Sequence, residues 1–280
     1  MADIILNDIV KIYEAPPQKR RGLRKAKVQV QPKRAVDGLT LTIPHGSFTV
    51  LVGPSGCGKT TLLNLILGIT DADSGEIWFE GRNITRVPME ERGFNIVFQD
   101  YALFPNLNVY KNITYGLRNK PDISTGQEVQ ELIDLLGLGE HLAKGIDQLS
   151  GGQKQRVALA RTMVMKPRIL LLDEPLSALD GVIKESIKEK IKEIAREFKL
   201  TTIIVTHDPE EALTLSDKVL IVNEGNIAQF GRPEEIIGQP ADSFVKNFIL
   251  NQLEVKRNNI FTLCSREMTR SSSQRISCTA

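Results

Sequence analysis

A glycine-rich stretch that carries one lysine and two threonines is the first candidate for chemistry. Its residues follow one another without a gap: Gly53, Pro54, Ser55, Gly56, Cys57, Gly58, Lys59, Thr60 and Thr61. They fit the pattern G-x-x-x-x-G-K-[ST], in which glycines allow successive backbone N–H groups to point at phosphate oxygens. Lys59 would bring a positive charge to the β- and γ-phosphates, and Thr60 would offer a hydroxyl to Mg²⁺. The stretch predicts a nucleotide-binding loop, but not what the nucleotide is used for.

A second glycine-containing stretch consists of Leu149, Ser150, Gly151, Gly152 and Gln153, and basic residues follow it. A serine and two glycines at the start of a helix make an anion site by the same backbone logic as the first stretch. Below, these two predicted anion sites, 53–61 and 149–153, are called the first and the second cradle. One γ-phosphate hardly needs both cradles in one subunit. The second cradle therefore needs another explanation.

Polar side chains stand at the ends of three further apolar segments. They are Gln99 at the end of 92–99, Asp173 and Glu174 after 169–172, and His207 after 201–206. Residues 169–172 are four apolar residues in a row, which predicts a strand buried on both faces of a parallel sheet, and 201–206 is expected to be another buried strand. Ligands of such sheets bind outside the carboxyl ends of the strands, so these ends are the expected site. His45 and His141, by contrast, look like turn and surface residues.

The elements that position these residues alternate between strand and helix. Strands are expected at 4–13, 35–43, 48–52, 76–81, 92–99, 169–172, 201–206, 218–223 and 226–230, and helices at 62–67, 124–138, 153–165, 183–198, 233–237 and 241–250. The order predicts an α/β fold with a mostly parallel sheet, an N-terminal antiparallel β region and an inserted α-helical subdomain over about 101–165. The segment 251–280 is expected to be an extension that is disordered from about 265.

Composition sets the broad class. Of the 280 residues, 41% are hydrophobic and 25% are charged, as in soluble globular proteins, and the net charge of +2 is too small to indicate nucleic acid. No apolar run approaches the roughly 18 residues of a membrane span, and the start does not resemble a secretory signal. Three scattered cysteines, Cys57, Cys264 and Cys278, argue against a disulfide framework or a zinc site. A cytoplasmic protein is expected.

A basic block interrupts the N-terminal region. Between Glu14 and Arg34 the chain carries eight lysines and arginines (Lys19, Arg20, Arg21, Arg24, Lys25, Lys27, Lys33 and Arg34) against one acid. The block could meet an acidic partner or anionic lipid headgroups. Alternatively it is a surface loop with solvated charges, which Pro16 and Pro17 favour.

Taken in order, the two glycine-containing motifs and the acid pair resemble the ATP-binding cassette (ABC) family over about residues 4–250. The resemblance implies a P-loop NTPase core over 1–250, with ATP and Mg²⁺ as cofactors and with ATPase activity. It also implies roles for single residues. Gln99 resembles the glutamine that reaches Mg²⁺ and the attacking water, Asp173 the aspartate that holds Mg²⁺, Glu174 the general base, Asp180 the D-loop aspartate, and His207 the histidine that contacts the γ-phosphate.

Tyr13 resembles the aromatic residue that stacks on adenine in this family, although the basic block separates it from Ala35. The alternative is a strand tyrosine packed in the core.

Resemblance also accounts for the second cradle. In the family, the serine and glycines of one subunit, here Ser150 and Gly152, close onto ATP that is bound by the P-loop of the other subunit. The implied assembly is a head-to-tail dimer, here a homodimer, with two shared sites. Hydrolysis removes the bridging γ-phosphate and the dimer reopens.

The segment from Gln99 to Val109 is similar to the importer type of cassette, which would act on separate transmembrane permease subunits and, indirectly, with a substrate-binding protein. The segment is most similar to importers of polyamines, ferric iron, sulfate, molybdate and sugars, whose longer members carry a further regulatory domain that the 30 residues from 251 to 280 are too few to form. Shorter nitrate, sulfonate or phosphonate importer ATPases stay possible. Tyr101, Leu103 and Phe104 are candidates for the permease-binding surface, or else they cap the helical subdomain.

The competing function is a soluble, non-transport ABC ATPase that acts on nucleic acid or the ribosome. DNA-repair types place a long coiled coil between the two motifs, and translation types carry two cassettes in one chain. No sustained heptad run lies between Lys59 and Ser150, and the sequence holds one P-loop. An importer subunit with no nucleic-acid partner is therefore the preferred prediction.

Overall fold

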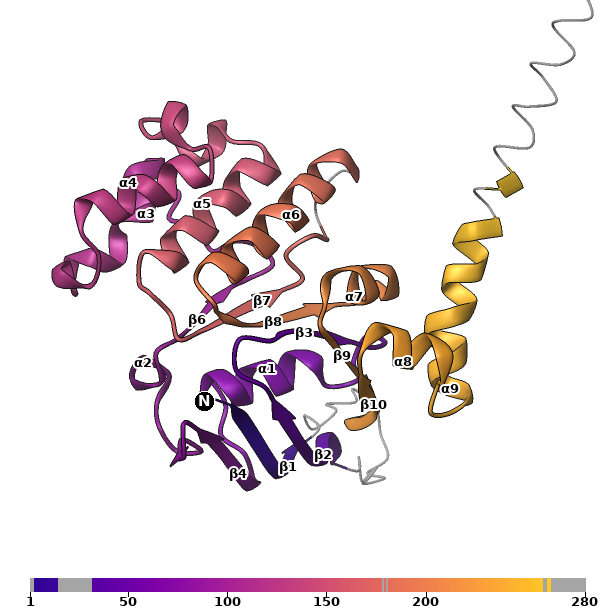
Figure 1. Cartoon of the computed structure of the whole chain (residues 1–280). Coiled ribbons are helices and arrows are strands. Elements are labelled where there is room, and N and C mark those ends of the chain that lie inside the picture. Colours follow the sequence, from indigo (N-terminus) through magenta and orange to yellow (C-terminus); the bar gives the residue numbers. More distant parts are fainter. Residues whose placement is uncertain (1–2, 15–31, 178, 180, 259–260, 263–280) are drawn as a thin grey trace, which may run out of the picture.

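Two β-sheets and a set of helices make up the fold (Figure 1), which a computed structural model describes for residues 3–14, 32–177, 179, 181–258 and 261–262. The strands are β1 (Ile4–Tyr13), β2 (Lys33–Ile43), β3 (Phe48–Val52), β4 (Ser74–Phe79), β5 (Arg82–Asn83), β6 (Phe94–Val97), β7 (Ile169–Asp173), β8 (Thr201–Thr206), β9 (Lys218–Asn223) and β10 (Asn226–Gly231). Asp180, most of the basic block and the tail from residue 263 lie outside the described residues.

The helices fill the intervals between these strands. They are α1 (Lys59–Leu67), α2 (Met89–Arg92), α3 (Val109–Ile113), α4 (Gly126–Leu135), α5 (Gly151–Met163), α6 (Gly181–Glu197), α7 (Pro209–Leu215), α8 (Pro233–Gly238) and α9 (Ser243–Val245). A π-helical turn, Lys246–Asn251, and helical residues 252–258 follow α9. No helix among the described residues is both long and apolar enough to cross a bilayer.

The larger sheet has six strands in the order β10-β9-β3-β8-β7-β6. Its pairs are parallel except for the β9–β10 hairpin. Strand β7 shows why its sequence is apolar throughout: Leu170 and Leu172 pack into one core cluster, and Ile169 and Leu171 into another. A strand that is buried on both faces needs apolar side chains at every position.

The two cores lie on opposite faces of the larger sheet. On one face, α1 lies between this sheet and the four-stranded antiparallel sheet β2-β1-β4-β5 (Figure 1). On the other face, α3 to α7 cover β6, β7, β8 and β3 (Figure 1). The predicted N-terminal antiparallel region and the mostly parallel sheet are both present.

Some predicted boundaries were wrong. The strand expected at 92–99 is β6, which begins at Phe94 because Arg92 ends α2 and Gly93 then turns the chain at φ 68°. The helix expected from Gln153 begins at Gly151, since Ser150 caps it. Helix α7 was not expected, because its seven residues are too few for a clear apolar period.

Candidate functional site

The P-loop predicted at 53–61 joins β3 to α1, the helix that begins at Lys59. At two of its glycines, the packing of the loop leaves no room for a side chain. A Cβ at Gly53 would lie 2.2 Å from the Val222 carbonyl oxygen, and one at Gly58, where φ is 110°, would lie 2.1 Å from the Ala35 carbonyl oxygen. Any larger residue would push the loop away from the strands behind it.

Donor groups converge in this loop. Among the described residues, the backbone N–H groups of Ser55, Gly56 and Gly58 donate to no protein atom. The Lys59 ammonium is buried and donates to the carbonyl oxygens of Gly53 at 2.7 Å and Pro54 at 2.9 Å. Free N–H groups, a cation and the N-terminus of a nine-residue helix together form a site for a phosphate chain.

The two carboxylates stand beside this loop at the carboxyl end of β7. Glu174 contacts two of the other residues that the sequence placed in the site. Its Oε2 accepts a hydrogen bond from Gln99 Nε2 at 3.3 Å and lies 3.4 Å from His207 Nδ1. These residues come from the ends of β6, β7 and β8, as the strand-end argument predicts. Glu174 has a φ of 46°, a left-handed conformation that is uncommon for a residue with a side chain and is often found at functional sites.

Burial and the neighbouring charge of Glu174 raise the pKa of Asp173, although Lys59 opposes this shift. A nearby cation would stabilise the charged form of the Asp173 carboxylate. Asp173 could therefore hold Mg²⁺ together with the Thr60 hydroxyl and the Gln99 amide. No group of three or more His, Cys, Asp or Glu side chains in the described part of the chain could hold a metal. A site with one carboxylate is what Mg²⁺ uses when phosphates and waters complete its shell.

The second cradle is built by helix capping. Ser150 Oγ accepts from the Gln153 N–H at 3.3 Å, and Gln153 Oε1 accepts from the Ser150 N–H at 2.9 Å, which is a capping box. Gln153 Nε2 lies 3.0 Å from His141 Nε2. No hydrogen bond or ion pair among the described residues joins Ser150, Gly151, Gly152 or Gln153 to the P-loop. The two cradles of one chain therefore do not form one site by direct contact.

The edge of the P-loop carries an aromatic ring and a second lysine. Tyr13 is 43% exposed, so the alternative that placed it in the core is wrong. It pairs with Lys33 across β1 and β2, and Lys33 Nζ donates to the Gly56 carbonyl oxygen at 3.1 Å. An exposed ring beside a phosphate site suits a base that stacks on it.

A sequence model described as "ABC transporter" matches residues 36–177, slightly more than half of the chain. The chain belongs to this family. Its cassette is 46% identical over 242 residues to the spermidine/putrescine import ATP-binding protein PotA of Mesoplasma florum, covering 85% of this chain and 69% of that protein. It is 48% identical to the PotA protein of Bacteroides thetaiotaomicron over 78% of this chain and 47% of that protein.

Solved cassettes share the fold. The dimeric cassette MJ0796 in a post-hydrolysis state, bound to ADP and Pi, has a TM-score of 0.68 and 27% identity, covering 82% of this chain and 98% of that one. The cassette cbiO1 of Clostridium perfringens, part of the transporter complex cbiONQ, has a TM-score of 0.70 and 26% identity, covering 91% and 98%. These matches confirm the predicted family and the α/β P-loop fold.

The structure corrects the surface assignment of Tyr101 in the cassette. Tyr101 is buried rather than exposed, and Phe104 packs against Tyr115 with the ring centroids 4.2 Å apart. This packing favours the alternative in which the segment caps the helices. His141 is partly exposed, and its Nε2 lies 3.0 Å from Gln153 Nε2 of the second cradle.

Sequence reasoning missed two residues of the cassette that act on these loops. Lys33 was counted as part of a solvated basic block, but the pairing of β1 with β2 brings it to Gly56. Arg161 on α5 donates to the carbonyl oxygens of Tyr101 at 2.9 Å and Ala102 at 2.7 Å, and it lies over the Phe104 ring. No local pattern marks either residue, since both contacts arise from tertiary structure.

Proposed function

We propose that this cassette is the ATP-binding and ATP-hydrolysing subunit of an importer, coupled to a separate transmembrane permease. The observation that carries the proposal is the meeting of Gln99 and His207 on Glu174, next to Asp173 and the P-loop. Polar residues at the ends of several strands surround the Glu174 carboxylate. This arrangement fits a hydrolysis in which a carboxylate orients water for attack on a phosphate.

The chain's residues divide the work of hydrolysis. Lys59 and the free N–H groups of the P-loop neutralise phosphate charge, and Tyr13 provides the ring for the base. Glu174 orients the attacking water and accepts its proton, while Gln99 and His207 hold the carboxylate in place. When bound, Mg²⁺ would neutralise charge on the phosphates, and Asp173, Thr60 and Gln99 would hold it.

The second cradle supports a dimer. Ser150 caps the thirteen-residue helix α5, and the N–H groups of Gly151 and Gly152 in its first turn donate to no protein atom among the described residues. We place them opposite the P-loop of a second copy. Asp180, which resembles the D-loop aspartate, lies outside the described residues. The solved MJ0796 cassette is a dimer, which supports this arrangement.

Import is supported by the relatives' names, which give spermidine and putrescine as the imported solutes. We propose polyamine import at the cytoplasmic face of a membrane, with a permease and a substrate-binding protein as partners. The cassette would comprise residues 1–250, with a helical subdomain over about 101–165. The relatives named above are import ATP-binding proteins, which favours import over the soluble non-transport alternative.

The role of Glu174 can be tested by Glu174→Gln. The amide keeps the size and the contact with Gln99 but cannot accept a proton, so ATP should still bind while turnover falls at least about 100-fold. Glu90→Gln, an exposed carboxylate on α2, serves as the control and should leave turnover unchanged. Wild-type turnover in Glu174→Gln would show that the hydrolytic assignment is wrong.

A further inference from the structure

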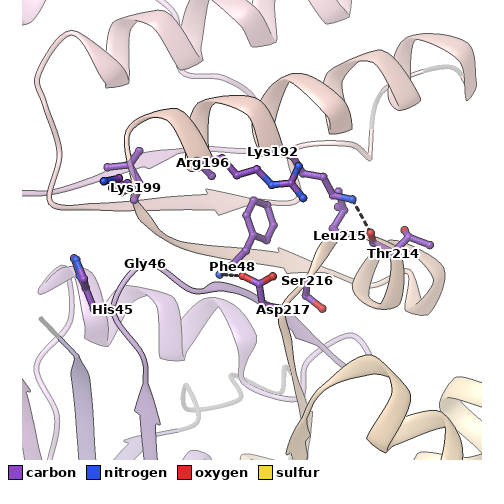
Figure 2. A pocket seen from close by; sticks show the side chains of 12 residues that line it. His45, Gly46, Phe48, Lys192, Arg196, Lys199, Thr214, Leu215, Ser216 and Asp217 are labelled. Atoms are coloured by element: carbon purple, nitrogen blue, oxygen red, sulfur yellow. Dashed lines mark hydrogen bonds between the residues drawn. The ribbon is translucent and has the colours of Figure 1, made fainter. Parts of the chain in front are cut away.

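A basic cavity lies at the end of the larger sheet that is remote from the P-loop. It has a volume of about 480 Å³ and is lined by the start of β3, the last turns of α6, and the segment between α7 and β9. Figure 2 shows Lys192 and Arg196 of α6 above the Phe48 ring, with Lys199 to one side. Cavities of this size accept small organic molecules.

The cations of this cavity, two on α6 and one just after it, lack the acidic partners that other cations of α6 have. Lys184 pairs with Glu211, Lys188 with Glu185, and Lys190 with Glu193. By contrast, no carboxylate of the described residues lies within ion-pair distance of the three cavity cations, which are Lys192, Arg196 and Lys199.

The single carboxylate of the lining does not offset these charges. Asp217 is engaged in the fold, because it accepts a hydrogen bond from the Phe48 N–H at 2.9 Å and its own N–H donates to the Phe48 carbonyl. Lys192 donates to the Thr214 carbonyl oxygen at 2.8 Å, which fixes its ammonium at the wall of the cavity. Arg196 and Lys199 have no hydrogen-bond acceptor for their side chains among the described residues.

The C-terminus of α6 explains part of this arrangement, because cations are favoured near the negative end of a helix dipole. The dipole end amounts to roughly half a charge, however, whereas three cations gather around one cavity. The remaining positive charge, above an apolar floor of Phe48, Leu200 and Leu215, is suited to a ligand that carries negative charge on an apolar body.

We propose that this cavity binds a small phosphate-bearing organic anion at a site separate from the ATP site. Arg196 offers a planar fork that matches phosphate oxygens, and Lys192 and Lys199 add point charges from either side. The apolar part of the ligand packs on the Phe48 ring and Leu215. Phosphate is favoured over a single carboxylate because its two negative charges match several cations at once.

The site can be tested by titrating phenyl phosphate into the full chain and measuring heat. The chain carries Lys59→Ala, so that the P-loop does not contribute. We expect a Kd of about 1 mM or tighter, weakened at least about tenfold by Arg196→Gln and by Lys192→Gln. Lys190→Gln, on the same helix but paired with Glu193 outside the cavity, is the matched control and should leave the Kd unchanged.

A second measurement guards against a folding defect in any variant. The melting temperature of each variant is recorded without ligand, and the backbone amide signals of Gly46 and Leu200 are followed by NMR in the Lys59→Ala chain. Shifts at both amides on adding phenyl phosphate support the site. No shift at either amide, or the same Kd in the Gln variants as in the control, would overturn the proposal.

Discussion

Glu174 contacts both Gln99 and His207, and its backbone is locally strained. Its φ of 46° is a conformation that a side chain disfavours, and its N–H is fixed by the Val205 carbonyl at 2.9 Å. Gln99 and His207 then approach its carboxylate from neighbouring strand ends. Such strain persists where the surrounding structure holds it, and here it directs the carboxylate towards its two partners.

The charge of Asp173 should reduce the stability of the ligand-free chain. Burial and Glu174 raise its pKa above the unfolded value, so the folded chain loses stability as pH rises through that folded pKa. We expect Asp173→Asn to raise the melting temperature at pH 7 to 8. The difference should shrink as pH falls towards the ordinary carboxyl pKa of about 4, where the unfolded chain is also protonated.

Thermal unfolding over a pH series measures this effect. An unchanged or lower melting temperature for Asp173→Asn at neutral pH would contradict the electrostatic description of the acid pair.

Lys33 should contribute to nucleotide binding. Its ammonium lies at the Gly56 carbonyl, beside the predicted phosphate site, although it belongs to the basic block in sequence. We expect Lys33→Ala to raise the Kd for ATP about three- to tenfold, which corresponds to about 1 kcal/mol.

The neighbouring Arg34 supplies the control for this titration, because it pairs with Asp37 instead of the P-loop. Arg34→Ala should bind ATP as the unmodified chain does. Equal Kd values for the two variants would remove Lys33 from the site.

At the scale of elements, Arg161 connects α5 to the turn after β6. Tyr101 and Ala102 both have left-handed backbone conformations, with φ of 64° and 44°. The Arg161 guanidinium donates a hydrogen bond to the carbonyl oxygen of each and lies over the Phe104 ring. Burial lowers the pKa of Arg161 despite the opposing charge of Asp100. The helix that starts with the second cradle is thereby joined to the segment after β6.

Removing this connection should loosen the turn. We expect Arg161→Ala to destabilise the chain by about 2 kcal/mol, since two hydrogen bonds from a charged donor are lost. Amide exchange at residues 100–103 should become faster. Lys154→Ala in the first turn of α5, whose side chain has no partner among the described residues, should cost less than about 0.5 kcal/mol. Equal exchange in both variants would contradict the connection.

Sequence patterns were sufficient to predict the bounds of strands that are determined by their own residues. Strands β1, β3, β8 and β9 have the predicted bounds, because runs such as 201–206 are apolar or β-branched and end at polar residues or turns. The site residues at strand ends were predictable for the same reason, since parallel strands bring their carboxyl ends to one edge.

Contacts between distant segments could not be predicted in this way. Gln99 and Glu174 are 75 positions apart, and Arg161 and Ala102 are 59 apart. The burial of Tyr101 depends on the same packing. Such contacts depend on how helices pack over the sheet, and a single sequence shows no spacing that marks them.

At the scale of the whole molecule, one chain holds two phosphate cradles that do not contact each other. The P-loop lies between β3 and α1, whereas Ser150 and the glycines start α5, in the group of helices on the other face of the larger sheet (Figure 1). In the proposed dimer, a site shared between two copies would give both cradles a phosphate to bind. ATP would then stabilise the dimer, and hydrolysis would release it.

The most direct test of this shared site is the mass of Glu174→Gln in solution with and without ATP, measured by light scattering for matched variants of Ser150. Asp and Asn both cap helices well, so Ser150→Asp and Ser150→Asn should leave α5 intact. Asp alone adds a negative charge against the γ-phosphate.

We predict that Glu174→Gln and its Ser150→Asn derivative form dimers with ATP, while the Ser150→Asp derivative binds ATP with an unchanged Kd and stays monomeric. Dimers of equal amount in all three chains, or monomers in all three at saturating ATP, would contradict a site shared between two copies.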